Sequence, residues 1–193
     1  MLKALSYSSV FIGIAAFSLS LFYGRLLDSI ILTRSLMIGL ATVAAYNFTQ
    51  LFPLRVRAPI NERGMWIKKN SKVLWGLSLL CLILCAGLSY YLTLYDWLNY
   101  LHLFVLCLLY ENSFGNRPAR KIPFIKPFYI SYIWTMATAA PAIYDAHSMG
   151  LSSGHLGLLA ECFLFMLSLC VLFDLRDIQE DESLGFATLA NTL

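Results

Sequence analysis

Three aspartates near the end of the chain have the spacing best suited to chemistry. Asp174, Asp177 and Asp181 stand at positions i, i+3 and i+7, so on an α-helix their carboxylates share one face. Mg²⁺ in proteins is usually held by one or two carboxylates together with the phosphates of a substrate. The pattern therefore suits a magnesium and phosphate site. The plainer interpretation is an acidic helix end in water, and spacing alone does not decide between the two.

The chain around these aspartates is too apolar for a soluble domain. Of its 193 residues, 59% are hydrophobic and 13% are charged, and the mean hydropathy is +0.69. A soluble domain has about 25% charged residues. A bilayer core needs roughly 20 apolar residues for each helical crossing. We therefore expect an all-α, multi-pass transmembrane bundle that forms a single domain over residues 1–193, with no separate soluble domain.

Apolar runs between charged breaks predict six membrane helices. They cover residues 5–24, 30–54, 72–95, 97–112, 127–146 and 155–175, and the fourth is short and follows Asp96 closely. Lysine and arginine gather between the second and third runs and between the fourth and fifth. Such loops stay in the cytoplasm, so we expect an integral membrane protein whose N-terminus, basic loops and aspartate segment are cytoplasmic.

The cysteines do not indicate a metal site. None has a paired spacing near histidines that would suit zinc. All five lie within apolar runs and are expected to be small core residues: Cys81, Cys85, Cys107, Cys162 and Cys170.

The aspartates belong to a longer pattern. The segment from Phe173 to Leu189 resembles the second aspartate-rich motif of the UbiA superfamily of intramembrane prenyltransferases, which is Asp-x-x-Asp-x-x-x-Asp followed by Gly-x-x-Thr-Leu. Residues 120–134 look like the basic start of that family's fifth helix, and Pro141 is placed to close it. The resemblance implies about six helices here, corresponding to the first two-thirds of a nine-helix fold. We therefore expect the C-terminal third of the domain to be missing from this sequence.

The first motif of the same family, Asn-x-x-x-Asp-x-x-x-Asp, is degenerate here. Asn47 takes the position of the asparagine, but Leu51 and Arg55 stand where the family has aspartates. A prenyl diphosphate carries about three negative charges, which two carboxylate clusters normally bind through bridging Mg²⁺. Half of that site is absent. Arg55 is able to contact phosphate directly through its guanidinium, although a topology anchor is the slightly favoured role.

The resemblance implies a function and a set of site residues. A family member transfers an isoprenoid from a prenyl diphosphate to a lipid-soluble, aromatic acceptor, with Mg²⁺ as cofactor. The metal would lie on Asp174, Asp177 and Asp181. The basic residues of the loop before the fifth run are explained equally well as topology signals. Membrane lipids are expected as further partners, and nucleic acid is not. The diphosphate would contact Asn47, Arg55, Arg120, Lys121 and Lys126.

Two other functions remain open at this point. A non-catalytic membrane protein that keeps the fold and binds isoprenoid lipid is favoured by the degenerate first motif. A small transporter is less favoured, because no predicted span carries a buried acid or a Gly/Pro-broken pair in matching halves.

Overall fold

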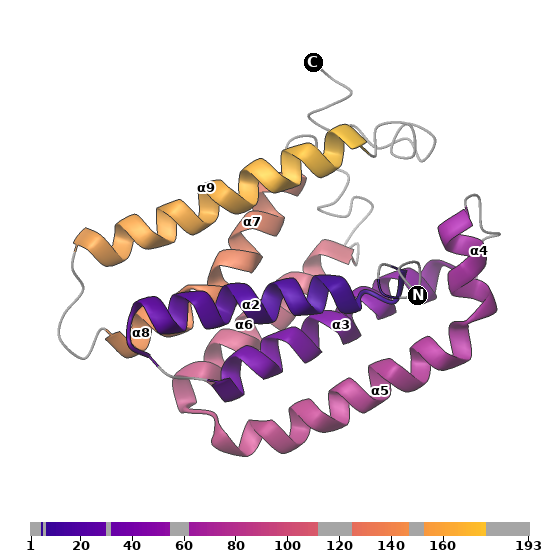
Figure 1. The fold of residues 1–193 in the computed structure, drawn as a ribbon, viewed down its shortest axis with the longest axis horizontal. Coiled ribbons are helices and arrows are strands. Elements are labelled where there is room, and N and C mark those ends of the chain that lie inside the picture. The colour runs from indigo at the N-terminus through magenta and orange to yellow at the C-terminus, as the bar shows by residue number, and fades with distance from the viewer. Residues whose placement is uncertain are drawn as a thin grey trace. The chain divides into compact units, whose positions relative to one another are not determined.

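The computed structural model describes residues 5, 7–29, 32–54, 62–111, 125–146 and 153–176. Every regular element in these ranges is helical and none is a strand (Figure 1), which confirms the predicted all-α class for this part of the chain. The elements are α2 (Val10–Leu26), α3 (Leu32–Leu54), α4 (Glu62–Lys69), α5 (Ser71–Leu88), the 3₁₀ helix η1 (Ser89–Tyr91), α6 (Leu94–Glu111), α7 (Ile125–Thr138), α8 (Ala140–Ala146) and α9 (Ser153–Arg176).

Each of the six predicted runs contains a helix, but the sequence prediction misses two features. The short helix α4 is polar, so a search for apolar runs passes over it. Glu62 in its first turn and Lys68 and Lys69 in its last turn complement the helix dipole. The predicted fifth span is divided into α7 and α8 at Ala139. Pro141 has no N–H to donate and its ring crowds the preceding turn, which explains the break.

Two segments in the described ranges are long and apolar enough to cross a membrane. They are Ser71–Tyr91 and Gly154–Phe173, whereas Val10–Leu26 and Leu94–Tyr110 are shorter apolar helices. Only 22% and 17% of the two longer segments are buried, while the core helix of a soluble protein is mostly buried. Length and composition thus permit two crossings, and the six-span arrangement stays a prediction.

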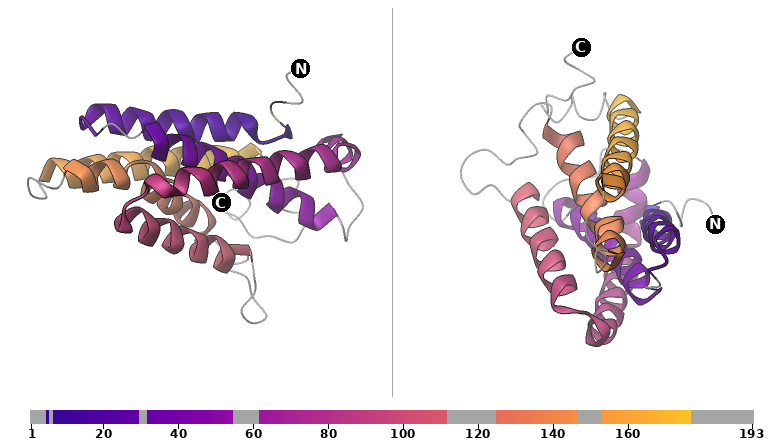
Figure 2. Two further views of the ribbon diagram at one scale, coloured as in Figure 1. Left: turned by 90° about the horizontal axis from the view of Figure 1, so that it is seen from below. Right: turned by 90° about the vertical axis from the view of Figure 1, so that its left-hand side faces the viewer.

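The chain divides into two compact units, Met1–Thr93 and Leu94–Leu193. In unit 1, α3 packs against both α2 and α5, and α4 packs against α3 and α5 (Figure 1). In unit 2, α7 runs between α6 and α9 and also packs against α8 (Figure 2). The central helices α3 and α7 therefore organise their units.

Two apolar clusters lie one after the other along α3 in the described part of unit 1. Val43 and Ala44 pack with Cys81 of α5 in the first cluster. The second joins Leu51 of α3 to Ile67 of α4 and Leu74 of α5. Side chains three or four residues apart share a helix face, so both clusters lie on the same face of α3.

The contact between α2 and α3 depends on two glycines. A Cβ at Gly13 would lie 2.8 Å from the carbonyl oxygen of Gly39, and a Cβ at Gly39 would lie 3.0 Å from that of Gly13. The hydroxyls of Ser20 and Ser35 share a hydrogen bond of 3.0 Å further along the same pair. Small residues that allow close backbone approach, with serine hydrogen bonds between helices, are typical of helix pairs in membranes.

We expect Gly13→Ala to destabilise the protein by about 1–3 kcal/mol, because the new methyl group meets backbone that has to move. Gly76→Ala is the matched control, since a Cβ there meets nothing within 4 Å. That substitution should be neutral or stabilising by up to about 1 kcal/mol. Reversible unfolding of both variants by SDS in mixed micelles, followed by circular dichroism, measures the difference. Equal unfolding midpoints would show that α2 and α3 do not depend on this close approach.

The helix pair α7 and α9 uses cysteines in its interface. The hydroxyl of Thr138 lies 3.8 Å from the sulfur of Cys162, and the hydroxyl of Ser131 donates to the sulfur of Cys170 at 3.7 Å. These two cysteines, like Cys81 and Cys85, are buried, as predicted. The prediction is wrong for Cys107, which is exposed.

Candidate metal and diphosphate site

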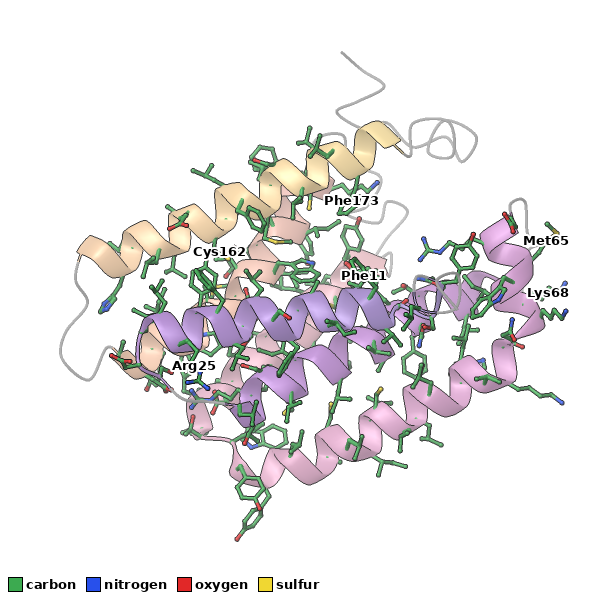
Figure 3. The ribbon with its side chains drawn as sticks, in the orientation of Figure 1. Phe11, Arg25, Met65, Lys68, Cys162 and Phe173 are labelled. Atoms are coloured by element: carbon green, nitrogen blue, oxygen red, sulfur yellow. The ribbon has the colours of Figure 1, made fainter. Side chains whose placement is uncertain are left out.

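The helix α9 carries the first residue of the aspartate triplet. Asp174 lies in its last turn, and the helix continues through Arg176. The backbone of Asp174 is therefore helical, as the proposed sharing of one face requires, while its side chain is not among those described. Asp177 and Asp181 lie outside the described residues. Figure 3 labels Phe173, the residue before Asp174, and Cys162, which contacts α7.

The packing of α7 against α9 brings a predicted basic residue to the end of unit 2 that carries Asp174. Thr138 pairs with Cys162 and Ser131 with Cys170, so the two helices run antiparallel. Lys126, the second residue of α7, precedes Ser131 by one and a half turns, and Asp174 follows Cys170 by about one turn. Both residues thus lie at the same end of this helix pair. Arg120 and Lys121 lie outside the described residues.

Asn47 lies in unit 1, in the middle of the apolar face of α3. It stands one turn after Val43 and one turn before Leu51, and its side chain is 0% exposed. Neither the nitrogen nor the oxygen of its carboxamide has a hydrogen-bond partner within the described ranges. Leu51, in the position of the missing first aspartate, is 2% exposed and packs on Ile67 and Leu74. Arg55 lies beyond the part of the chain that is described.

Two polar residues next to Asn47 are missed by sequence reasoning. The side-chain nitrogen of Gln50 donates to the hydroxyl of Ser9 at 3.1 Å, which joins α3 to the start of α2. Ser9 is 0% exposed and has a left-handed backbone with φ of 61°. The side-chain oxygen of Gln50 is buried and accepts no hydrogen bond from any described residue. The sequence signal for Gln50 is its position three residues after Asn47, because residues three apart are neighbours on a helix surface.

Unit 2 contains a buried acid that the sequence interpretation does not place within a helix. Asp96 lies in the first turn of α6 and is 1% exposed. Asp96 lies between the predicted runs 72–95 and 97–112, and the structure instead includes it in α6. The first turn suits a carboxylate because the N-terminal end of the helix dipole is positive. Nearby, Asn99 donates from its side chain to the carbonyl of Met136 on α7 at 3.0 Å. This hydrogen bond accounts for Asn99 as part of the packing of α6 against α7.

Within the described ranges, no three histidine, cysteine, aspartate or glutamate side chains gather as metal ligands. Asp177 and Asp181 lie outside these ranges, so the statement does not include them. The donor set of the triplet nevertheless fits Mg²⁺, which prefers carboxylate oxygens. Asp174, Asp177 and Asp181 are the residues that would hold the ion.

No protein-family model, curated protein or solved structure matches this chain. Its function is therefore argued from its own residues.

Proposed function

We propose that this chain is a multi-pass membrane protein of UbiA type that binds a prenyl diphosphate through Mg²⁺ on its aspartate triplet. One observation carries the proposal. The sequence from Phe173 to Leu189 follows the family's second motif, and it begins in the last turn of an apolar helix long enough to cross a membrane.

The arrangement of unit 2 supports the diphosphate part of the proposal. Lys126 begins α7 at the end of the α7 and α9 pair that also carries Asp174. Arg120 and Lys121 precede Lys126 closely in the sequence, so the chain can bring further positive charge to this end. Cations and a metal at one site neutralise phosphate charge in a low-dielectric environment, where each interaction is stronger than in water. Arg55 is the fourth cation assigned to the diphosphate.

Bound Mg²⁺ would neutralise the diphosphate and assist its departure as a leaving group. The protein's own contribution is the three carboxylates of the triplet, the first of which lies in the last turn of α9. The lipid-soluble, aromatic acceptor and the prenyl chain would lie among the apolar helices. The proposed activity is transfer of the prenyl group to that acceptor, weakened or lost because the first motif is degenerate.

A specific observation favours the alternative, a non-catalytic protein that binds isoprenoid lipid. Leu51 is packed in the second core cluster of unit 1, at a position where the family has a metal-binding aspartate. The first half of the metal site is therefore replaced by apolar packing, which stabilises the fold but binds no cation.

Magnesium binding tests the part of the proposal that both alternatives share. The purified protein should bind Mg²⁺ weakly and should bind it more tightly with farnesyl diphosphate present, because phosphate oxygens complete the coordination shell. Asp177→Asn should abolish this synergy. Isothermal titration calorimetry of Mg²⁺ with and without the diphosphate measures it.

Asp145→Asn is the matched control, since it removes the same charge near the end of α8. It should leave the synergy unchanged. An Asp177→Asn protein that still binds Mg²⁺ and diphosphate together would remove the triplet from the site.

A further inference from the structure

The buried amides of unit 1 have more hydrogen-bonding capacity than the surrounding protein uses. Asn47 is 0% exposed, and both polar atoms of its carboxamide lack a partner among the described residues. The side-chain oxygen of Gln50 is also buried and has no hydrogen-bond partner among the described residues. A buried polar group without a hydrogen bond costs folding free energy, and the cost persists unless another molecule supplies the bond. We therefore expect these two amides in the apolar core of unit 1 to form hydrogen bonds with a bound molecule.

The residues around Asn47 indicate whether the bound molecule is charged or neutral at this position. Val43, Ala44 and Leu51, one turn away on either side along α3, are buried and apolar. A carboxamide offers a donor and an acceptor but no charge. A diphosphate with about three negative charges would need cations to compensate for its loss of water. This position of α3 therefore suits a neutral group, in contrast to the diphosphate role that the family resemblance assigns to Asn47.

The chemistry of the amides further defines the group. Asn47 can donate and accept, and the free acceptor of Gln50 is its oxygen, while its amide nitrogen already donates one hydrogen bond to Ser9. A hydroxyl is the simplest group that donates and accepts at once. The neighbouring side chains are apolar and aromatic: Val10, Phe48 and Leu77 pack against the first cluster, and Trp75 packs edge-on against Phe48 with ring centroids 5.0 Å apart. These surroundings suit an apolar body attached to the hydroxyl.

The start of α2 is joined to Gln50 at a strained turn. Ser8 and Ser9 are buried turn residues, and Ser9 has a left-handed φ of 61°. Such a conformation is unfavourable for a residue with a side chain and persists only where the surrounding structure holds it. Here the hydrogen bond from Gln50 holds Ser9 in place.

We propose that Asn47 and Gln50 bind the hydroxyl head of a lipid-soluble alcohol or phenol, with Gln50 held in place by its hydrogen bond to Ser9. The site lies entirely within unit 1 and does not depend on the aspartate triplet. It goes beyond the proposed function by assigning unit 1 a second, neutral ligand. A water molecule is the other source of a hydroxyl, and the experiment separates the two.

The test titrates the full-length protein in detergent with farnesol and with farnesyl methyl ether, which keeps the oxygen acceptor but loses the donor. Tryptophan fluorescence reports binding, because Trp75 lies beside Phe48. The wild-type protein should bind farnesol about tenfold more tightly than the ether, as expected for a site whose amide acceptors would otherwise stay unpaired. Asn47→Leu should weaken farnesol binding by about tenfold without lowering the thermal unfolding temperature, since an apolar side chain needs no partner.

Asn99→Leu is the matched control, because Asn99 is also buried but donates to Met136. It should lower the unfolding temperature and leave farnesol affinity unchanged. Gln50→Met gives a second test on a half-buried residue and should also weaken farnesol binding. Equal affinity for farnesol and its ether, or unchanged farnesol affinity in Asn47→Leu and Gln50→Met, would overturn the proposal. Absence of farnesol binding to the wild-type protein would also overturn it and identify water as the occupant.

Discussion

A reporter fused after Leu193 is expected in the cytoplasm, and one inserted within residues 147–152 is expected on the opposite side of the membrane. The reason is the distribution of basic residues, because loops rich in lysine and arginine resist translocation. The basic loops precede α5 and α7, so the segment between α8 and α9 should face outward. Each reporter gives an all-or-none signal. Alkaline phosphatase is active only outside the cytoplasm, and green fluorescent protein is used to report a cytoplasmic position.

The insertion at 147–152 tests the weakest span directly. The helix α7 has 14 residues and α8 has 7, separated by the break at Ala139. Fourteen helical residues extend about 21 Å, less than the roughly 30 Å of a bilayer core. The crossing therefore requires both helices together. A cytoplasmic signal from this insertion would show that α7 and α8 do not cross, and it would overturn the six-span topology.

The helices themselves were predictable because long apolar runs are a strong signal. Helices α2, α3, α5, α6 and α9 lie where hydropathy places them, with bounds that differ by a few residues. The polar helix α4 was missed because its formation depends on end charges and on packing of Ile67 against Leu51 and Leu74. Pro141 was identified, but its effect was predicted as the end of a helix, and the structure instead continues in α8.

The candidate sites were predictable only where a motif marks them. Asn47 was singled out by the position of the first motif, yet its complete burial and lack of partners depend on how α3 packs. The contact between Gln50 and Ser9 joins residues 41 positions apart and has no signal in sequence spacing. The same holds for Gly13 and Gly39, since sequence does not indicate which glycines will face each other across a helix pair.

Prenyl transfer by this chain is expected to be very slow or absent. A complete site uses two carboxylate clusters and bridging Mg²⁺ to stabilise the charge that develops on the leaving diphosphate. Loss of a stabilisation worth several kcal/mol slows the chemical step by orders of magnitude, because each 1.36 kcal/mol is about tenfold in rate. Diphosphate binding depends on the triplet and the basic loop, so it should survive where turnover does not.

The packing of Leu51 indicates that restoring the missing aspartate would not repair the site. Leu51 is 2% exposed, so Leu51→Asp would place a carboxylate in contact with the apolar side chains of Ile67 and Leu74. We expect a loss of stability larger than that of Leu51→Ala, which should cost about 2–5 kcal/mol for the cavity it leaves. SDS unfolding of the two variants compares these costs.

Turnover is measured by incubating membranes that contain the protein with radiolabelled prenyl diphosphates, Mg²⁺ and a panel of aromatic and other lipid-soluble acceptors. Little or no prenylated product is expected from the wild-type protein, and Leu51→Asp should not increase it. The control is Asp174→Ala combined with Asp181→Ala, which removes two carboxylates of the triplet. Clear product from the wild-type protein that disappears in this control would contradict the prediction. It would show that Arg55 or another group replaces the absent aspartates.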